Sequence, residues 1–347
     1  MQKGVTRKSV TAKDVAEACG VSQATVSYVI NNSAGGRISE ATRLRVLEVS
    51  RQMGYCPSQS ARSMRMSRAM AVGVVLGGNS LSLGVSHALR GIKRRMDATG
   101  YAQVLLSDED DVLPGVDYLS QYRAGRIDAL LFLFHEMPDE LVNELRAQNV
   151  PYLALSEQGI TGESLSLSSG YTDALDDCAR MMRERALTRV HYYSFQHGET
   201  LHSRKFNMFR AALMKECPEA QLERVVLRTD RMSDEQLLDA LYGDICTGGF
   251  DIAVTPHARL GWMVQNAILR KRLAVPQDVK HLCLSTAHPF SLVYPSITMI
   301  DIPLTQLGDV AAQHMLNMIA PAGAARQEAD APPEMPKCCL RPGMSTM

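Results

Sequence analysis

The 347 residues suffice for two or three domains, and 46% of them are hydrophobic, which is ordinary for a globular protein with a substantial core. No apolar run approaches the roughly 18 residues that a membrane span needs. The first ten residues, MQKGVTRKSV, carry charge without the apolar stretch of a secretory signal. We therefore expect a cytoplasmic protein that does not bind a membrane.

Charge is distributed unevenly along a chain whose formal net charge is zero. Residues 1–70 hold 11 Lys and Arg against 4 Asp and Glu, whereas the rest of the chain holds 26 against 33. A basic head thus precedes an acidic body. Such asymmetry is typical of a phosphate-binding module joined to a domain of another kind.

The eight cysteines are scattered, at positions 19, 56, 178, 217, 246, 283, 338 and 339. They form no CxxC motif and have no histidine at zinc spacing, so we expect reduced, mostly buried thiols and neither a metal nor a cofactor. The adjacent Cys338 and Cys339 could chelate a soft metal or respond to redox, but plain thiols are the simpler interpretation.

Residues 11–32, TAKDVAEACGVSQATVSYVINN, read as two short helices joined by a tight turn. Thr11 and Asp14 have the spacing of a capping box, and Gly20 predicts the end of the first helix, whose apolar stripe is Val15, Ala16 and Cys19. Ser22 is the predicted N-cap of the second helix. Its inward residues are Val26, Val29 and Ile30; its outward residues are Gln23, Ala24, Thr25, Ser27 and Tyr28. A polar, uncharged outer face suits base edges and phosphates, as in a helix-turn-helix, although any two short amphipathic helices could show this pattern.

A third helix is predicted from Ser39 to about Met53, with Gly54 as its end. We expect Leu44, Val46 and Leu47 to supply its apolar contact. The following segment, residues 58–68, is basic and has too little apolar surface to be stable alone. It could fold when a groove and phosphates are supplied.

From Ala71 onward, short apolar runs alternate with helical patterns. Strands are predicted at 71–77, 101–108, 127–134, 150–157, 188–195, 223–229, 250–256 and 279–286, with helices between them. This order implies right-handed crossovers and two doubly wound parallel-sheet lobes that meet near residues 164–170. Ligands in such architectures bind where the carboxyl ends of the strands face a cleft.

Residues 10–32, VTAKDVAEACGVSQATVSYVINN, and 37–64, RISEATRLRVLEVSRQMGYCPSQSARSM, resemble the head and hinge of the LacI/GalR family of bacterial transcription regulators. The resemblance implies an all-α helix-turn-helix DNA-binding domain at 1–56 and a hinge helix or linker at 57–70. An α/β effector-binding and dimerisation domain, similar to periplasmic binding proteins, would follow at 71–347. Its lobe 1 would span about 71–165 and 302–330, and its lobe 2 about 166–301 and 331–347.

By this resemblance, residues 22–32 form the recognition helix in the major groove of an operator. Gln23, Ala24 and Tyr28 would read bases, and Ser22, Thr25 and Asn31 would contact phosphates; Thr11 and Ser27 complete the predicted set on the helix pair. Many members carry arginine at the position of Tyr28, and arginine binds guanine with two hydrogen bonds. Tyrosine predicts a weaker demand for guanine or contact with a thymine methyl group, unless Tyr28 only packs against the backbone.

In the hinge, Met64 stands where most members carry leucine. Two hinge helices of a dimer would insert this residue into the minor groove and kink the duplex, with Arg62 and Arg65 on flanking phosphates. The alternative is a plain linker.

The body departs from the family at ligand-binding positions. Ser82 and Leu83 begin a loop that differs from the usual Asn-Pro-Phe-Phe type, Lys205 replaces a sugar-binding arginine, and Thr255-Pro256 replaces Asn-Asp. Such a cleft fits a free sugar poorly, because paired carboxylates and a bidentate arginine are what read several hydroxyls. Basic residues and hydroxyls favour an anionic metabolite instead. The candidate effector-binding residues are Ser82, Leu83, His135, Arg204, Lys205, His257 and Ser285, although for each single histidine a surface or hydrogen-bonded role is the simpler interpretation.

We therefore expect a dimeric repressor of a pseudo-palindromic operator, controlled by a small molecule in the interlobe cleft and associated with the nucleoid when bound. No leucine heptad follows the last predicted strand, so no tetramer is expected. The alternative is a regulator with a degenerate cleft that answers to no small molecule or to a partner protein. A solute-binding protein or an enzyme of the same architecture is a third hypothesis, but nucleophile, base and metal patterns are lacking.

Overall fold

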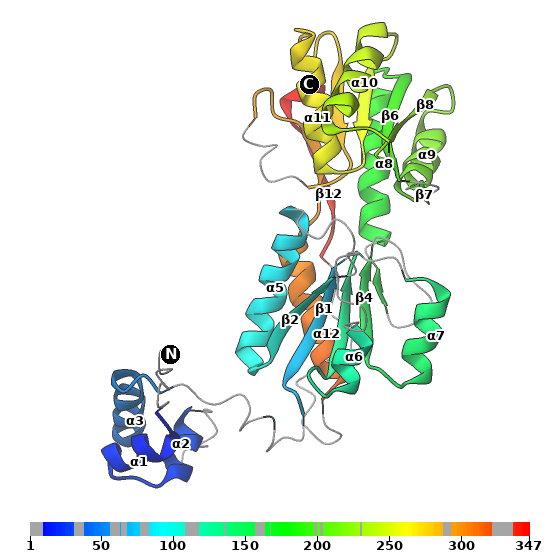
Figure 1. Ribbon diagram of the computed structural model, residues 1–347. Helices are drawn as coiled ribbons and strands as arrows, with labels where there is room; N and C mark the ends of the chain where they lie inside the picture. Colours follow the sequence, from blue (N-terminus) through cyan, green and yellow to red (C-terminus); the bar gives the residue numbers. More distant parts are fainter. Residues whose placement is uncertain are drawn as a thin grey trace, which may run out of the picture. The chain divides into compact units, whose positions relative to one another are not determined.

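Figure 1 shows the computed structural model of the chain. The structure describes residues 10–30, 38–55, 63, 68–76, 83–107, 118–134, 137–156, 164–166, 168–197, 200–201, 204–229, 231–286, 293–320 and 336–347. Contacts divide the chain into two compact units, Met1–Met70 and Ala71–Met347. None of the helices in these ranges is long and apolar enough to span a membrane.

The first unit contains three helices, α1 (Ala12–Cys19), α2 (Gln23–Ile30) and α3 (Glu40–Gln52). The predicted capping box of α1 is present: the Asp14 N–H donates to Thr11 Oγ1 over 3.3 Å, and the Thr11 N–H donates to Asp14 Oδ2 over 2.7 Å. Gly20 ends α1 with a φ of 65°, in the left-handed region that glycine adopts readily. These local signals set the helix boundaries before any packing contact is made.

Six residues from the three helices form the buried core of this unit: Val15, Ala16, Cys19, Val26, Val29 and Val46. The expectation for α3 was wrong for two of its three residues, because Leu44 and Leu47 are 56% and 37% exposed. Successive helical residues are about 100° apart, so the side of α3 that holds Val46 faces the core while Leu44 lies opposite. Ile38, Val49 and Met53 complete the inward side.

The second unit begins with a five-stranded sheet of β1 (Ala71–Leu76), β2 (Ala102–Ser107), β3 (Ala129–Leu133), β4 (Tyr152–Ser156) and β5 (Ser164–Ser166). All pairings in it are parallel, in the order β2-β1-β3-β4-β5. The associated helices are α5 (Leu83–Thr99), α6 (Tyr118–Arg123), α7 (Asp139–Ala147) and α12 (Leu304–Met318). Helix α7 lies on the side of the sheet away from α5 (Figure 1).

Helices α5 and α12 pack with their backbones nearly touching. A Cβ atom at Gly91 would lie 1.9 Å from the Thr305 carbonyl oxygen, and one at Gly308 would lie 2.1 Å from that of Ala88. Only glycine allows this approach. Asp309 accepts ion pairs from Arg94 at 3.2 Å and Arg95 at 2.5 Å beside the crossing. Burial opposes ionisation of Asp309, but the two arginines outweigh it and lower the carboxyl pKa.

The second sheet has seven strands. They are β6 (Arg189–His197), β7 (Thr200–Leu201), β8 (Gln221–Arg228), β9 (Ile252–Thr255), β10 (Lys280–Cys283), β11 (Thr298–Asp301) and β12 (Cys339–Arg341). Strands β8, β6, β9, β10 and β11 are parallel neighbours, whereas β7 and β12 pair antiparallel at the edges. The predicted pair of parallel-sheet lobes is therefore confirmed. The short strands β5 and β7 were not predicted.

Helices cover both faces of the second sheet, and β6 shows why. Val190 and Tyr192 belong to the core cluster of α8 (Ser168–Glu184) and α9 (Arg204–Glu216), whereas Tyr193 and Phe195 belong to that of α10 (Asp234–Thr247) and α11 (Ala258–Arg270). Successive side chains of a strand point to opposite faces, so a continuous apolar run is buried on both.

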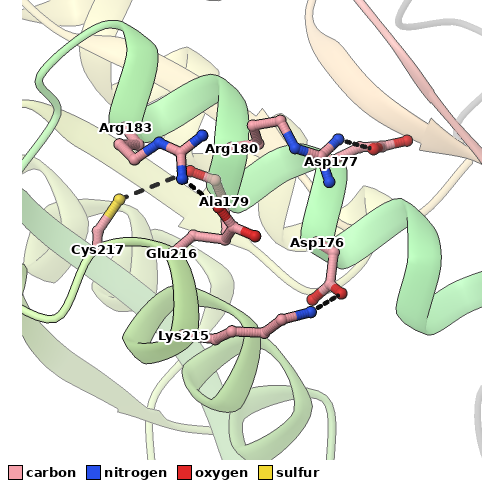
Figure 2. A network of polar contacts seen from close by, with 8 residues as sticks. All are labelled: Asp176, Asp177, Ala179, Arg180, Arg183, Lys215, Glu216 and Cys217. Carbon is pink, nitrogen blue, oxygen red and sulfur yellow. Dashed lines mark hydrogen bonds and ion pairs between the residues drawn. The ribbon is translucent and has the colours of Figure 1, made fainter.

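Polar contacts join α8 to α9 (Figure 2). Lys215 pairs with Asp176 and Arg183 with Glu216, each at 2.6 Å, while Cys217 Sγ approaches the Ala179 carbonyl at 3.7 Å. Arg180 pairs with Asp177 within α8 at 2.6 Å. The Lys215 and Arg183 side chains are half or more exposed, so these pairs add little stability and order the surface more than they hold the helices together.

The last described residues are anchored in the second sheet by hydroxyl groups. The Gly343 N–H donates to Thr298 Oγ1 over 2.9 Å, and the Thr298 and Thr346 hydroxyls lie 2.7 Å apart. Ser345 Oγ accepts from the Thr298 N–H and donates to the His281 carbonyl. Thr298, Ser345 and Thr346 are fully buried, so these hydrogen bonds replace the water that the hydroxyls lose on folding.

Candidate nucleic-acid interface and strand-end cluster

The start of α2 presents most of the predicted base-reading residues to solvent. Ser22 acts as the N-cap, because its Oγ accepts from the Thr25 N–H over 3.1 Å and lies 2.9 Å from the Thr25 hydroxyl. Gln23 and Ala24 are exposed, and Tyr28 is 52% exposed. Thr25 and Ser27 are half-buried at the sides of this surface. The predicted base-reading residues therefore form an exposed surface at the start of α2, with the positive end of the helix dipole at Ser22.

Thr11 has a clear structural role at the first helix of the pair. Its hydroxyl lies 2.8 Å from Asp14 Oδ2 and accepts from the Asp14 N–H, and the residue is exposed. Its predicted contact with DNA stays a prediction beside this capping function.

The described helical part of the first unit is itself electrically balanced. Ion pairs join Lys13 to Glu17 at 3.9 Å, Arg43 to Glu40 at 3.1 Å, and Arg51 to Glu48. Residues 10–30 and 38–55 hold four basic and four acidic side chains in all. The positive excess belongs to the flanking sequence: Lys3, Arg7, Lys8, Arg37, Arg62, Arg65 and Arg68. Long-range attraction to phosphates therefore comes from the segments around the three helices rather than from the helices.

Several predicted site residues lie outside the described residues: Asn31, Arg62, Met64, Arg65, Ser82 and His135. Leu83 is the first residue of α5. The structure therefore tests neither the minor-groove wedge nor the first-lobe side of the effector site.

Helices α8 and α9 and the carboxyl ends of β9 and β10 come together around Lys205. Lys205 Nζ donates to the Pro256 carbonyl oxygen over 3.0 Å and lies 5.9 Å from the centre of the Tyr171 ring. The Tyr171 hydroxyl donates to the Leu284 carbonyl over 2.7 Å. A half-buried ammonium is thus held at the strand ends, with Arg204 exposed beside it in sequence and Ser285 half-buried after β10.

Beneath this cluster lies a buried polar chain. The Thr255 hydroxyl is 3.2 Å from His281 Nε2, and His281 Nδ1 is 3.2 Å from Gln265 Oε1. Burial lowers the pKa of His281 to about 3, so the imidazole is neutral. Burial also raises the pKa of the Cys283 thiol to about 11, against the opposing effects of the Thr255 hydroxyl and the Lys205 charge. Thr255 therefore faces the protein interior and not a ligand.

His257 is brought to the same edge as the N-cap of α11, where its Nδ1 accepts from the Leu260 N–H over 3.4 Å. The His257 and Phe195 rings lie 5.2 Å apart. Arg259 lies 5.3 Å from the Phe195 ring centre and pairs with Asp234 at 2.6 Å. The structure therefore places His257 between β9 and α11, Ser285 just after β10, and Lys205 at the start of α9, where it contacts the end of β9.

Sequence reasoning missed Tyr171 and the Pro256 carbonyl, because neither signals a site by its residue type. It also missed the contact of Thr286, whose hydroxyl donates to the Ile300 carbonyl over 3.1 Å and accepts from the Ile302 N–H at a short distance. These partners are distant in sequence, and no local spacing predicts them.

Two other features of the described residues lie apart from this cluster. A surface pocket of about 280 Å³ is lined by α8 residues and by Leu340 and Pro342, next to the Arg180–Asp177 pair (Figure 2). Across the ranges described, no group of three or more His, Cys, Asp or Glu side chains is arranged to hold a metal ion. None of the seven described cysteines is in a disulfide, and five of them are buried.

Comparison with known protein families adds two matches. Residues 11–58 match the model of bacterial regulatory proteins of the lacI family, and residues 179–346 match that of the periplasmic binding protein-like domain. The first match covers the three helices, and the second covers all seven strands of the second sheet.

Individual relatives agree over nearly the whole chain. The ribose operon repressor of Escherichia coli (strain K12) is 24% identical and covers 89% of this chain and 93% of its own. Catabolite control protein A of Priestia megaterium is 23% identical, with 87% and 90% covered. A crystal structure of the Lac repressor dimer bound to operator and the anti-inducer ONPF superimposes with a TM-score of 0.71 at 21% identity, covering 98% of this chain and 100% of that one.

The matched models and relatives agree with an architecture of a helical head followed by two parallel-sheet lobes. The relatives are transcriptional regulators and not enzymes. The chain belongs to the LacI/GalR family of bacterial transcriptional regulators, as a DNA-binding repressor.

Proposed function

We propose that the protein is a dimeric repressor that reads a pseudo-palindromic operator with α2 and whose affinity is set by a small molecule between the lobes. The observation that carries the DNA-reading part is the capped start of α2, with Gln23, Ala24 and Tyr28 exposed together. A two-fold dimer reads two half-sites about one helical turn apart. The Lac repressor structure, a dimer bound to operator, supports this arrangement by its likeness in fold.

The test of DNA reading is a gel-shift titration on a pseudo-palindromic duplex selected from a random library, repeated at several salt concentrations. We expect tight specific binding whose affinity falls steeply with salt, because phosphate contacts release counterions. A flat salt dependence, or failure to select any site, would argue against the proposal.

Within the same proposal, the residue 57–70 segment is a hinge whose Met64 wedges into the minor groove. Met64→Gly should weaken binding to the selected site while leaving binding to random duplex nearly unchanged, since only the kinked site uses the wedge. Arg62→Gln is the matched comparison and should weaken both duplexes alike, as expected for a phosphate contact. Equal losses for Met64→Gly on the two duplexes would show that the segment is a plain linker.

For the effector we propose an anionic metabolite at the carboxyl ends of β9 and β10. Lys205 is held there by the Pro256 carbonyl and the Tyr171 ring, and the exposed Arg204 precedes it. No described carboxylate of this cluster stands ready to read sugar hydroxyls, because Asp234 is paired with Arg259. An ammonium and a guanidinium together favour a carboxylate or phosphate ligand.

A second candidate is a regulator that answers to no small molecule or to a partner protein. It is favoured by the strand-end hydroxyls, which are already hydrogen-bonded within the protein: Tyr171 to Leu284, Thr255 to His281, and Thr286 to Ile302. A ligand gains little from groups that must first break such bonds.

Thermal unfolding over a panel of sugar phosphates, sugar acids and free sugars separates these candidates. A true effector raises the melting temperature with its concentration. We expect the shift for anionic compounds only, and its loss in Arg204→Gln. Arg210→Gln is the matched control, since Arg210 is exposed on the same helix α9 and outside the cluster. A panel without any shift supports the second candidate.

A further inference from the structure

The outer face of α3 carries an apolar stripe that the core of the first unit does not use. Leu44 and Leu47 are 56% and 37% exposed, and Glu40 and Arg51 extend the same face at helical spacing. Both ends of the stripe are charged and exposed, with side chains 66% and 78% accessible. We propose that this face pairs antiparallel with α3 of a second copy of the chain when two heads are brought together on DNA.

The choice of a second copy rests on the symmetry of the stripe. In an antiparallel pair related by a two-fold axis that crosses α3 midway between Leu44 and Leu47, each Leu44 faces Leu47 of the other copy. The same axis sets Glu40 opposite Arg51. A two-fold interface requires such self-complementarity, and a solvated face has no reason to show it.

Arg43 and Glu48 lie on the two flanks of the stripe, on opposite sides of the leucines, so the same axis does not bring them face to face. Within one helix, Glu40 is bound to Arg43 at 3.1 Å and Glu48 to Arg51. In the antiparallel pair, Arg43 and Glu48 keep these intrahelical partners. The charges that face each other across the axis, Glu40 and Arg51, are then of opposite sign, whereas a parallel two-fold pair would set Glu40 against Glu40 and Arg51 against Arg51.

The proposed contact between two α3 helices is small, and its size determines under which conditions it forms. Four leucine side chains form the apolar part, far less than an interface that holds two free proteins together. Heads already bound to neighbouring half-sites or operators have a high effective concentration, so a weak contact suffices to couple them. The pairing thus makes binding to neighbouring sites cooperative. This effect goes beyond the operator recognition proposed for α2.

The test measures binding of the full-length protein to duplexes that carry one or two copies of its selected site. In the two-site duplexes, the spacing is varied in half-turn steps so that the proteins lie on the same or opposite faces. We expect about tenfold tighter binding per site at a favourable spacing than on the one-site duplex, which is about 1.4 kcal/mol of coupling. If the paired heads belong to one dimer, the effect is seen on the one-site duplex instead.

Charge exchange provides the decisive variants. Glu40→Arg and Arg51→Glu each oppose like charges across the axis and should abolish the coupling, whereas the double variant restores opposite charges and should regain it. Leu44→Ser with Leu47→Ser should remove the coupling, and Ala41→Ser, exposed on α3 outside the stripe, should not. Melting curves check that each variant folds.

Failure of the double variant to regain what the single variants lose, or an unchanged coupling in the leucine variant, overturns the pairing. Those outcomes leave specific binding to a single site intact and so differ from failure of the proposed function. If no DNA site is selected, self-association of the full chain is measured instead, by sedimentation at rising protein concentration. Wild type and double variant should then associate more strongly than either single variant, and equal behaviour overturns the pairing.

Discussion

The start of α2 in the first unit and the strand-end cluster of the second unit both carry polar side chains, but they use them in opposite ways. At α2, Gln23 and Tyr28 are exposed to solvent, and Ser22 and Thr25 bond to one another. At the ends of β9 and β10, the hydroxyl of Thr255 and the ammonium of Lys205 bond to the protein itself. A surface with open hydrogen-bonding groups is ready for a partner, whereas a satisfied cluster must rearrange first.

The difference also concerns what supports each site. The first unit has a small core of six buried residues, and its recognition surface depends on caps and turns within about 20 residues of sequence. The second unit has extensive cores on both faces of its seven-stranded sheet. Its strand-end cluster depends on residues more than 50 positions apart, such as Lys205 with Pro256 and Tyr171 with Leu284. Disturbing the second unit should therefore leave the reading surface of the first unit intact.

The largest expected effect comes from a substitution that forces α5 and α12 of the second unit apart. It should destabilise the second unit and leave the first unit unchanged. In Gly308→Ala, the new Cβ would lie 2.1 Å from the Ala88 carbonyl oxygen, so the helices must shift. We expect a loss of about 3 kcal/mol and a fall of roughly 6–12 °C in the melting temperature of the second unit. Gly243→Ala, in α10 with open space around it, should be neutral or slightly stabilising. Calorimetry of both variants measures this, and a parallel fall in a separate first-unit transition would contradict the independence of the units.

Acid should act on the second unit through His281. Its folded pKa is about 3 because of burial, and its unfolded value is about 6.5. The unfolded state binds the extra proton, so the contribution is complete above pH 6.5 and falls by about 1.4 kcal/mol per pH unit below it. At pH 4.5 the loss is about 3 kcal/mol. Asp251 and Asp309, whose pKa values are lowered, lose their contribution only below this window.

Urea unfolding of the second unit between pH 7 and 4.5 measures this loss, with His281→Gln as the comparison. Glutamine keeps a hydrogen-bonding group near Thr255 and does not titrate. Its curve should be flatter with pH by about one proton. The same slope in both proteins would show that the imidazole is not the group that acid charges.

How much of this structure the sequence predicts depends on how far apart along the chain the interacting residues lie. The capping box at Thr11, the left-handed Gly20 and the apolar strands such as β1 and β3 are local signals, and each was confirmed. The exposure of Leu44 was mispredicted because a short apolar pattern does not show which side of α3 meets α1 and α2. The hydrogen bonds of Tyr171 and Thr286 join distant segments, so the satisfied state of the strand ends required the fold.

The base preference of the exposed surface at the start of α2 should change when Tyr28 alone is substituted. Tyr28→Arg offers two donors to guanine in the major groove and should favour a guanine at one base step by about 1–3 kcal/mol, or roughly 5- to 150-fold. Tyr28→Phe removes only the hydroxyl and tests whether it donates to a base. Site selection with the three proteins gives the preference at each position. If all three select the same sequence, Tyr28 contacts the backbone and does not read a base.

The smallest expected effect compares one local device in both units. Thr11 and Asp14 cap α1, and Ser233 and Gln236 form the same capping box at α10, with donor–acceptor distances of 2.7 and 3.3 Å in the first and 2.8 and 3.3 Å in the second. Thr11→Ala and Ser233→Ala should each cost about 1 kcal/mol. The small unit has a smaller unfolding entropy, so the same loss should lower its melting temperature by about 4–8 °C but that of the large unit by only about 2–4 °C. Calorimetry of the two full-length variants measures both shifts. Equal shifts would mean that the two units unfold as one cooperative structure and that the head is stabilised by more than its own three helices.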